Sequence, residues 1–419
     1  MRRSWTRWAD VAEKTAPGGF LDPEFLKCPF PVLKQIRETA PVMYLELMGR
    51  GLYLVSGYDA VRRVLLDPVH FSSIVNVPGR TTPEAQKIVE KGGYGRNHRS
   101  LQNNDAPGHT AYRALVNEAF RPKRIRQMSD YVDGVVNELI DKILATQGVA
   151  DVVYDFAVPL PLIVISDQLG VPREMYRTFK QWSDAWLAGL GAERSDEEMI
   201  SDAHLVVDMQ KYLAARIDER RVGPAEDILS DLAFAEVDGQ ALDTGEILGI
   251  VEQLLVAGNE TTTNAIAAGL HLLATQPELH QRLRDSPELV TEFVEEVLRA
   301  EAPVQGLFRR AIEDVEIEGI AIPKDGILMV HYGAANRDEA RFDAADSFDL
   351  ERPKKGAHIA FGSGIHHCVG SELARVEMRA SFAAFTSRFT RLEMLDDEVA
   401  YHPTFALRGI RSLNMRCIS

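Results

Sequence analysis

The stretch FGSGIHHCVG, residues 361–370, places a cysteine among three glycines, a serine and two histidines, directly before the helix-like run SELARVEMRASF. The chain contains only three cysteines, Cys28, Cys368 and Cys417, so a cysteine in so flexible a setting needs an explanation. Three explanations are open. The first is that Cys368 is a small apolar side chain of the core, the second that it is a nucleophile, and the third that it is a metal ligand.

The residues around Cys368 favour a reactive or metal-binding sulfur. Glycines at 362, 364 and 370 permit tight turns and close approach of the backbone. A helix that begins near Val369 would direct amide N–H groups at the sulfur and favour its thiolate form. No second cysteine pair and no HxxxH spacing accompany His366 and His367, which disfavours zinc. The CxxCH signature of covalent haem attachment is absent as well.

Composition limits the class of protein. The chain has 419 residues, of which 45% are hydrophobic, and a formal net charge of −15. An acidic chain of this kind repels nucleic acid. Three widely spaced cysteines fit a reducing compartment better than a disulfide framework. The N-terminus has no apolar signal-peptide region, and no apolar run is long enough to cross a bilayer. We therefore expect a cytoplasmic protein that does not enter the membrane.

The chain shows no repeat, low-complexity segment or long linker, so we expect a single domain over residues 1–419, in which residues 1–40 carry no recognisable motif. Residues 40–60 predict two short strands, and residues 314–333 predict a hairpin with a Pro-Lys-Asp-Gly turn. From about Asp105 the apolar spacing is helical. The polar stretch 76–100 indicates a mobile access loop. The predicted fold class is mainly α with a minor β-sheet region.

One predicted helix, from Asp243 to Gln276, is unusually long. Thr244 is the expected N-cap and Pro277 ends the run, which gives a length of roughly 48 Å at about 1.5 Å per residue. Its apolar sequence is interrupted by GNETTTN, residues 258–264. This polar segment indicates either an exposed face or a functional kink in a buried helix.

The loop at 361–370 resembles the haem-binding loop of the cytochrome P450 family, F-x-x-G-x-x-x-C-x-G, with Phe361, Gly364, Cys368 and Gly370 at the defined positions. The resemblance covers the chain from about Pro41 to its end. It implies the P450 fold, with a long central helix over a haem. It also implies that Cys368 is the axial thiolate of haem b, and that glycines such as Gly362 let the porphyrin approach. A thiolate ligand favours O–O cleavage.

Two further motifs match this family. EEVLR resembles its E-x-x-R pair, which implies that Glu296 and Arg299 form a buried structural network with Arg352 of the later loop NRDEARFDAADSFDLER.

AGNETT resembles the family motif A-G-x-D/E-T-T on the long helix. The match implies that Ala257 and Gly258 lie beside the haem and leave room for dioxygen. It also implies that Glu260 and Thr261 deliver the protons that O–O cleavage needs.

The resemblance also implies partners for the two haem propionates. These are His109 and Arg113, four residues apart in NDAPGHTAYR, with Arg309 in PVQGLFRRA and His366 in the cysteine loop. Arg310 is the alternative if the register of Arg309 is shifted by one.

Substrate contacts are implied in the stretches 76–100 and 183–200, and at a set of mostly apolar positions: Val256, Thr262, Val304, Gln305 and Leu307. The expected activity is hydroxylation of an apolar small molecule (a terpenoid, steroid or aromatic) with O2 and two electrons. We expect a monomer that receives these electrons from a separate ferredoxin with its NAD(P)H-dependent reductase. RPKRIR, residues 121–126, is either the docking patch for that partner or a solvated helix end.

Two alternatives remain at this point. A peroxide-driven peroxygenase is disfavoured by the Glu260–Thr261 pair, which such members of the family generally lack. A non-catalytic haem sensor or carrier would leave the same pair without a role.

Overall fold

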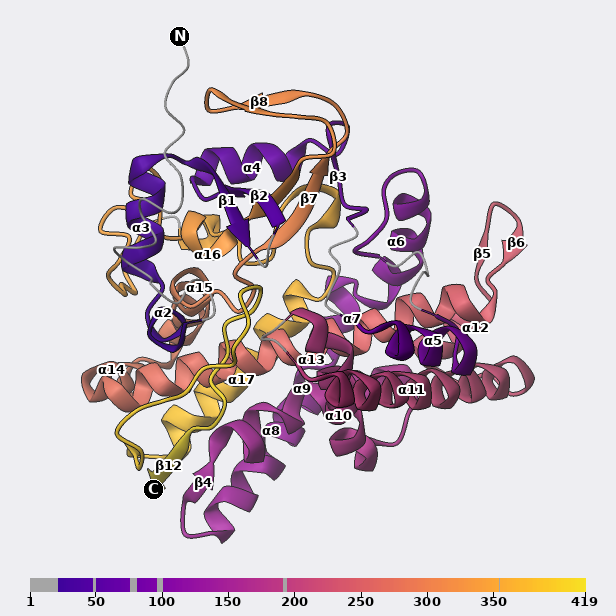
Figure 1. Ribbon diagram of the computed structural model, residues 1–419. Coiled ribbons are helices and arrows are strands. Elements are labelled where there is room, and N and C mark those ends of the chain that lie inside the picture. The colour runs from indigo at the N-terminus through magenta and orange to yellow at the C-terminus, as the bar shows by residue number, and fades with distance from the viewer. Residues whose placement is uncertain (1–21, 48–49, 76–80, 96–100, 191–193, 354) are drawn as a thin grey trace. The chain divides into compact units, whose positions relative to one another are not determined.

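The computed structural model describes residues 22–47, 50–75, 81–95, 101–190, 194–353 and 355–419 (Figure 1). The chain forms two compact units. Unit 1 comprises Met1–Val77, Thr291–Cys368 and Val399–Arg411, and unit 2 comprises Pro78–Val290, Val369–Glu398 and Ser412–Ser419. Helices predominate and the strands are short, which confirms the predicted fold class. The single domain expected over residues 1–419 stays a prediction.

Unit 1 contains a five-stranded sheet with the strand order β1-β2-β10-β7-β3. The two strands predicted in residues 40–60 are present as β1 (Val42–Leu47) and β2 (Arg50–Val55), which pair antiparallel. β10 (Ile327–Val330) is parallel to β2 and antiparallel to β7 (Leu307–Ala311), and β7 pairs with β3 (Phe71–Ser72). Segments far apart in sequence therefore meet in this sheet.

The predicted hairpin in residues 314–333 is present, but its turn was assigned wrongly. β8 (Val315–Ile317) and β9 (Ile320–Ile322) are joined at Glu318 and Gly319, which both have positive φ, as a tight hairpin turn requires. The Pro-Lys-Asp-Gly turn, residues 323–326, instead leads into β10.

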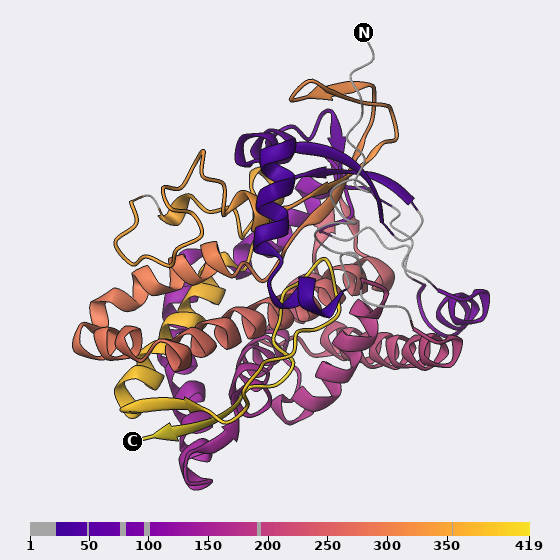
Figure 2. The same cartoon turned by 60° about the vertical axis from the view of Figure 1, so that its left-hand side comes forward.

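Among the described residues, these α-helices accompany the sheet of unit 1: α2 (Pro23–Lys27), α3 (Phe30–Thr39), α4 (Tyr58–Leu66), α15 (Val290–Ala300, in unit 1 from Thr291 on) and α16 (Tyr332–Ala335). Figure 2 shows α3 alongside the β1–β2 strands, where its Leu33 and Ile36 share a buried cluster with Leu45 and Leu54. A second cluster joins α4 to the other face of the strands through residues such as Val61 and Val55. Apolar burial of this kind fixes the sheet on which the candidate site is built.

Unit 2 is mostly helical. Its helices are α5 (Pro83–Gly92), α6 (Gly108–Ala119), α7 (Pro122–Gln127), α8 (Ser129–Ala145), α9 (Pro159–Leu169), α10 (Tyr176–Leu187), α11 (Asp196–Val222), α12 (Ile228–Ala233), α13 (Thr244–Thr275), α14 (Pro277–Asp285) and α17 (Ser371–Arg388). Its strands are β4 (Val149–Asp151), β5 (Glu236–Val237), β6 (Gln240–Ala241), β11 (Arg391–Met394) and β12 (Asn414–Ile418).

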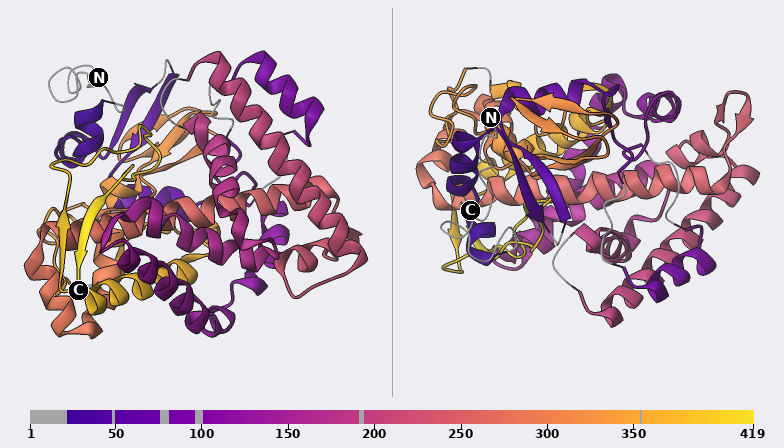
Figure 3. Two further views of the ribbon diagram at one scale, coloured as in Figure 1. Left: turned by 90° about the horizontal axis from the view of Figure 1, so that it is seen from below. Right: turned by 45° about the horizontal axis from the view of Figure 1, so that its top comes forward.

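The prediction of an access loop over residues 76–100 is wrong for the centre of this stretch, which forms the helix α5. Thr82 caps the helix by accepting from the amide of Ala85, and Pro83 occupies the first turn, where proline costs no hydrogen bond. Figure 3 shows α5 alongside α11, and Val89 packs there in one cluster with Val206 and Val207. Residues 76–80 and 96–100 lie outside the described residues.

The long helix α13 spans 32 residues and ends before Pro277, close to the prediction. Its N-cap is Asp243 rather than the predicted Thr244, because Asp243 and Glu246 form a reciprocal capping box. The helix runs unbroken through the polar segment. Among the residues that the structure describes, no helix, α13 included, has both the length and the apolar character that crossing a bilayer requires.

Candidate active site

The cysteine loop of unit 1, residues 361–368, closes on itself through its backbone. The amide of Cys368 donates to the carbonyl of Phe361 at 2.9 Å, and the amide of His367 donates to the carbonyl of Gly364 at 3.1 Å. A 3-10 turn, η7 (Gly364–His366), lies between them. The Cys368 side chain is exposed on this ring, whereas Cys417 is buried and burial raises the pKa of its thiol to about 12.

Two glycines shape the loop in different ways. Gly362 and Gly364 have φ values of +69° and +72°, a conformation that side-chain-bearing residues rarely adopt. A Cβ at position 364 would lie 2.4 Å from the carbonyl oxygen of Leu65, so the space there is closed as well. A Cβ at position 362 would have the Tyr332 hydroxyl as its nearest neighbour, at 3.6 Å. Position 364 thus requires glycine for two reasons and position 362 for one.

Glu296, Arg299 and Arg352 form one buried network in unit 1. Arg299 binds Glu296 through two hydrogen bonds of 2.7 and 2.8 Å, and Arg352 donates to the same carboxylate at 3.1 Å. The two guanidinium groups also donate to five backbone carbonyls: Asn336, Asp343, Ala344, Ala345 and Ser347. A buried charge network is costly to break by removing one member, so it fixes residues 336–352 against α15.

Arg309 and Arg310 point to opposite faces of β7. Arg310 is paired with Asp325 at 2.7 Å on the exposed side. Arg309 is only 6% exposed, and its guanidinium donates to the carbonyl of Phe308 at 2.8 Å. Within the described ranges no carboxylate lies within ion-pair distance of Arg309. A buried cation without an anion is unfavourable, so Arg309, rather than Arg310, is suited to an anionic ligand.

His366 and Tyr332 are two further polar side chains of unit 1. The Nε2 atom of His366 lies 2.9 Å from the hydroxyl of Ser73. Burial raises the pKa of the Tyr332 phenol, although the charge of Arg309 acts in the opposite direction. Tyr332 was not predicted from the sequence, because no motif marks it.

In unit 2, the polar segment of α13 is largely buried, so the exposed-face alternative is wrong for most of it. Its buried residues are Asn259, Glu260, Thr262, Thr263 and Asn264. Thr263 donates to the carbonyl of Ala157 at 2.9 Å, and Asn259 donates to Ser183 at 2.9 Å. The hydroxyl of Thr261 donates back to the carbonyl of Ala257 at 3.0 Å. Gly258 faces Ile165 of α9 at an ordinary contact distance.

Glu260 has a cationic partner that the sequence did not reveal. The ammonium of Lys180, on α10, lies 3.2 Å from Glu260 and also pairs with Asp184, one turn further along α10. Burial alone lowers the pKa of Lys180, but the two carboxylates outweigh it and raise this pKa above its ordinary value. Lys180 is therefore a permanent cation at neutral pH. The only signal in the sequence is the i,i+4 spacing of Lys180 and Asp184, which does not point to Glu260.

His109 and Arg113 lie one turn apart on α6. His109 is buried, and Arg113 donates to Asn117 at 2.8 Å. Gly370 is the N-cap of α17, which begins at Ser371 rather than near Val369. A Cβ at position 370 would meet no atom of the described residues within 4 Å.

The residues expected to contact substrate are distributed over both units. In unit 2, Val256 and Thr262 are buried, whereas Ala257 is exposed on α13. In unit 1, Leu307 is half-buried on β7, and Val304 is bridged to Leu407. Gln305 is buried and donates to the carbonyl of Ala302 at 2.7 Å.

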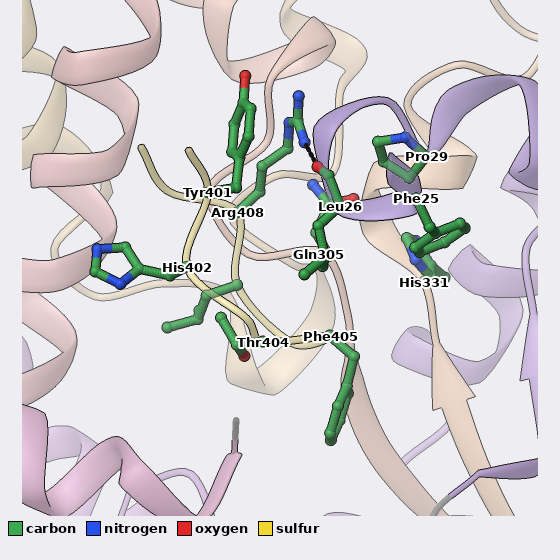
Figure 4. Close-up of a pocket in the computed structure, with 11 residues that line it drawn as sticks. Phe25, Leu26, Pro29, Gln305, His331, Tyr401, His402, Thr404, Phe405 and Arg408 are labelled. Atoms are coloured by element: carbon green, nitrogen blue, oxygen red, sulfur yellow. Dashed lines mark hydrogen bonds between the residues drawn. The ribbon is translucent and has the colours of Figure 1, made fainter. Parts of the chain in front are cut away.

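Gln305 also lines a pocket in unit 1, together with Phe25, Leu26, Pro29, His331, Tyr401, His402, Thr404, Phe405, Leu407 and Arg408 (Figure 4). Val304 and Leu307 are not among its lining residues. The Arg408 guanidinium is occupied by Glu301 and by the carbonyls of Leu26 and Lys27. Among the described residues that line this pocket, the one guanidinium is therefore already bound within the protein.

Comparisons with known proteins show the family to which this fold belongs. The family model of Cytochrome P450 matches residues 197–407. The cytochrome P450 monooxygenase PikC of Streptomyces venezuelae is 35% identical over 95% of this chain and 93% of its own. The 6-deoxyerythronolide B hydroxylase of Saccharopolyspora erythraea is 34% identical over 91% of this chain and 94% of its own. The solved structure of cytochrome P450 CREJ in complex with (4-ethylphenyl) dihydrogen phosphate superposes with a TM-score of 0.88, at 31% identity, over 94% of this chain and 98% of its own.

A fold of this kind, shared with proteins named as a monooxygenase and a hydroxylase, defines an oxidoreductase. The chain belongs to the cytochrome P450 family, is of the bacterial type and is an enzyme of that family.

The residues present fit the haem that the family implies. Cys368 exposes a soft sulfur ligand of the kind that haem iron accepts. Arg309 is a buried cation that lacks a carboxylate among the residues described, and haem b carries two carboxylates.

Proposed function

We propose that this protein is a haem b monooxygenase that hydroxylates an apolar small organic molecule with O2 and two electrons from a separate ferredoxin. The observation that carries the proposal is the exposed sulfur of Cys368 on a loop closed by its own backbone. The haem supplies oxygen activation when it is bound. We further propose that the protein acts as a monomer in the cytoplasm.

The roles proposed for the individual side chains are those that the family resemblance implies. Cys368 ligates the iron, and Phe361, Gly362 and Gly370 shape the surroundings of the sulfur. Arg309 and His366, together with His109 and Arg113, bind the propionates as cations or hydrogen-bond donors.

Glu260 and Thr261 move protons to the reacting oxygen. Lys180 places a cation 3.2 Å from Glu260, so the two side chains form a polar pair on the buried segment of α13. Thr261 donates to the Ala257 carbonyl, so its hydroxyl oxygen can accept a hydrogen bond from an O–H donor such as water.

The substrate proposal is an apolar molecule of the terpenoid, steroid or aromatic class, held by Val256, Ala257, Thr262, Val304, Gln305 and Leu307. The hydroxylase of 6-deoxyerythronolide B is similar over nearly the whole chain, so that compound joins the set to be screened. Val256, Val304 and Leu307 provide apolar contact, and Gln305 is the polar anchor.

The electron donor is proposed to bind at the exposed cations of α7. Two of the four cations in residues 121–126 are offset by acids, since Arg121 pairs with Glu118 and Arg124 lies 3.7 Å from Asp231. Lys123 and Arg126 have no carboxylate within 4 Å in the part of the chain that the structure describes. These two residues are left to attract an acidic ferredoxin.

The test has two steps. The reduced protein treated with CO should show the absorption typical of thiolate-ligated haem, and Cys368→Ser should abolish it. A panel of apolar compounds is then screened for a low-to-high-spin shift, and each hit is incubated with ferredoxin, reductase and NADH. A hydroxylated product supports the proposal. Product formed with peroxide alone would replace it by a peroxygenase, and ligand binding without any product would replace it by a sensor or carrier.

A further inference from the structure

The segment that leads into the cysteine loop is held by side chains rather than by secondary structure. The amide of Ile359 donates to Oδ1 of Asn336 at 2.7 Å, and the amide of Ala360 donates to Nδ1 of His358 at 3.2 Å. The next bond follows directly, because the amide of Gly362 donates to the carbonyl of Ile359 at 2.9 Å. Two consecutive buried amides thus depend on two side-chain acceptors.

The hydrogen bonds of His358 define its tautomer. Its Nδ1 accepts from an N–H group and therefore carries no proton in this arrangement. Its Nε2 lies 3.2 Å from a carboxylate oxygen of Glu295, so Nε2–H is the donor. The imidazole is nearly fully buried, with 1% of the side chain exposed. His358 therefore links Glu295 of α15 to the backbone of Ala360 in one fixed orientation.

Asn336 makes a second link to the same helix. Its carbonyl accepts from Arg299 at 3.0 Å, and its side-chain oxygen accepts from Ile359. Its Nδ2 atom is buried and has no partner among the described residues. Of the two polar atoms of the Asn336 side chain, only the oxygen makes a hydrogen bond with the described residues.

These links continue to the sulfur through Phe361. The ring of Phe361 lies between those of His358 and His367, with centroid distances of 5.9 and 6.4 Å. The carbonyl of Phe361 accepts from the amide of Cys368. A displacement of His358 would therefore move the residue to which the backbone of Cys368 is bonded.

We propose that Asn336 and His358 are positioning residues that fasten residues 359–361 to α15 and so hold the sulfur of Cys368 in place as a ligand. The inference rests on the proposed function insofar as that sulfur ligates haem iron. Neither residue touches the sulfur, and each acts through the backbone of the loop. Positioning of a ligand by residues outside the coordination sphere commonly tunes the ligand itself.

The test compares substitutions that remove a hydrogen-bond acceptor with matched control substitutions, all in the haem-loaded protein. His358→Phe and Asn336→Ala each remove one acceptor. Asn336→Asp keeps the acceptor oxygen and should restore the behaviour of the unmodified protein. His331→Asn is the control for a buried histidine, because Nδ1 of His331 also accepts from a backbone amide, that of Ala334 at 3.1 Å, at the start of α16 (Figure 4).

Two readouts are measured, namely amide hydrogen exchange of the peptide covering residues 356–368 and the fraction of reduced, CO-bound protein that keeps thiolate ligation during mild heating. In His358→Phe and in Asn336→Ala we expect the amides of this peptide to exchange at least tenfold faster than in the unmodified protein. We also expect both variants to lose thiolate ligation earlier during the heating. His331→Asn should match the unmodified protein in both. Where one of these variants fails to fold, His358→Asn and Glu295→Gln, which weaken the hydrogen bond between His358 and α15, should show the same changes to a smaller degree.

Unchanged exchange and unchanged ligation in His358→Phe and Asn336→Ala, or equal changes in His331→Asn, would overturn the proposal. Failure of the proposed function is recognised separately, since the unmodified protein would then lack thiolate-type absorption altogether. Hydrogen exchange reports on the loop independently of that absorption.

Discussion

The ammonium of Lys180 lies 3.2 Å from the carboxylate of Glu260 and joins α10 to the polar segment of α13. The same ammonium pairs with Asp184, so one cation is shared between a buried carboxylate and an exposed one. Removal of one partner of a buried charge pair is strongly destabilising. Lys180 is therefore the side chain whose substitution tests the environment of Glu260.

Removal of Glu260 or of its cation should slow proton delivery. We expect Glu260→Gln to lower ferredoxin-supported product formation by about 10²-fold, the lower end of what a positioned acid or base contributes. Lys180→Met should lower it less, because Glu260 keeps its carboxylate but loses the ammonium that lies 3.2 Å away. Lys180→Arg keeps the charge and serves as the control. A rate of product formation in Lys180→Met equal to that of the unmodified enzyme would contradict this role.

Reversal of the free cations on α7 should weaken association with an acidic ferredoxin. We expect Lys123→Glu with Arg126→Glu to lower the association rate by roughly tenfold or more at low salt and to flatten its salt dependence. Stopped-flow electron transfer at several ionic strengths measures both effects. Lys87→Glu with Lys91→Glu on α5 makes the same change in net charge at exposed positions elsewhere, and it should leave the rate close to normal. Equal slowing by both pairs would indicate a general charge effect and no patch.

The three cysteines should differ in their reaction with iodoacetamide. Cys28 is exposed and should be alkylated in every preparation. Cys417 is buried, burial raises the pKa of its thiol to about 12, and it should stay unmodified while the fold is intact. Cys368 should react in haem-depleted protein and be protected in haem-loaded protein. Peptide mass spectrometry gives each extent, and the same reactivity of Cys368 in both preparations would argue against ligation.

Glu377 on α17 should make stability depend on pH. It is buried, and burial raises its pKa from 4.5 to about 8. The folded state therefore keeps a proton that the unfolded state loses above about pH 4.5, so this residue reduces stability progressively as the pH rises towards 8. We expect Glu377→Gln to match the unmodified protein at pH 4.5 and to be more stable at pH 8, by on the order of a few kcal/mol.

Thermal unfolding midpoints at the two pH values measure this effect. Glu372→Gln on the exposed side of the same helix is the control and should change little. A Glu377→Gln variant whose midpoint falls with pH as steeply as that of the unmodified protein would exclude Glu377 as the cause.

Features set by neighbouring residues could be predicted from the sequence. The length of α13 follows from its apolar spacing and from Pro277, and the strands in residues 40–60 follow from alternation. The N-cap was wrong by one residue because Asp243 and Thr244 are both good caps. Glu246, three residues after Asp243, decides between them through the reciprocal bond.

Contacts between distant segments could not be predicted in the same way. Lys180 meets Glu260 across 80 residues, and His358 meets Glu295 across 63. No periodicity or motif spacing reports such a pair, because the contact exists only after the helices pack. The hairpin turn was wrongly assigned to residues 323–326 for the same reason. The strand that follows them, β10, pairs with β2, which lies far earlier in the chain.

The two left-handed glycines of the cysteine loop have a consequence for laboratory evolution. Position 364 is closed by the Leu65 carbonyl as well as by its backbone angle, so a saturation library there should return glycine only, whatever substrate is used for selection. At position 362 a Cβ would have room beside Tyr332. A library at this position should therefore also return some asparagine and aspartate variants, since these residues tolerate positive φ angles best after glycine.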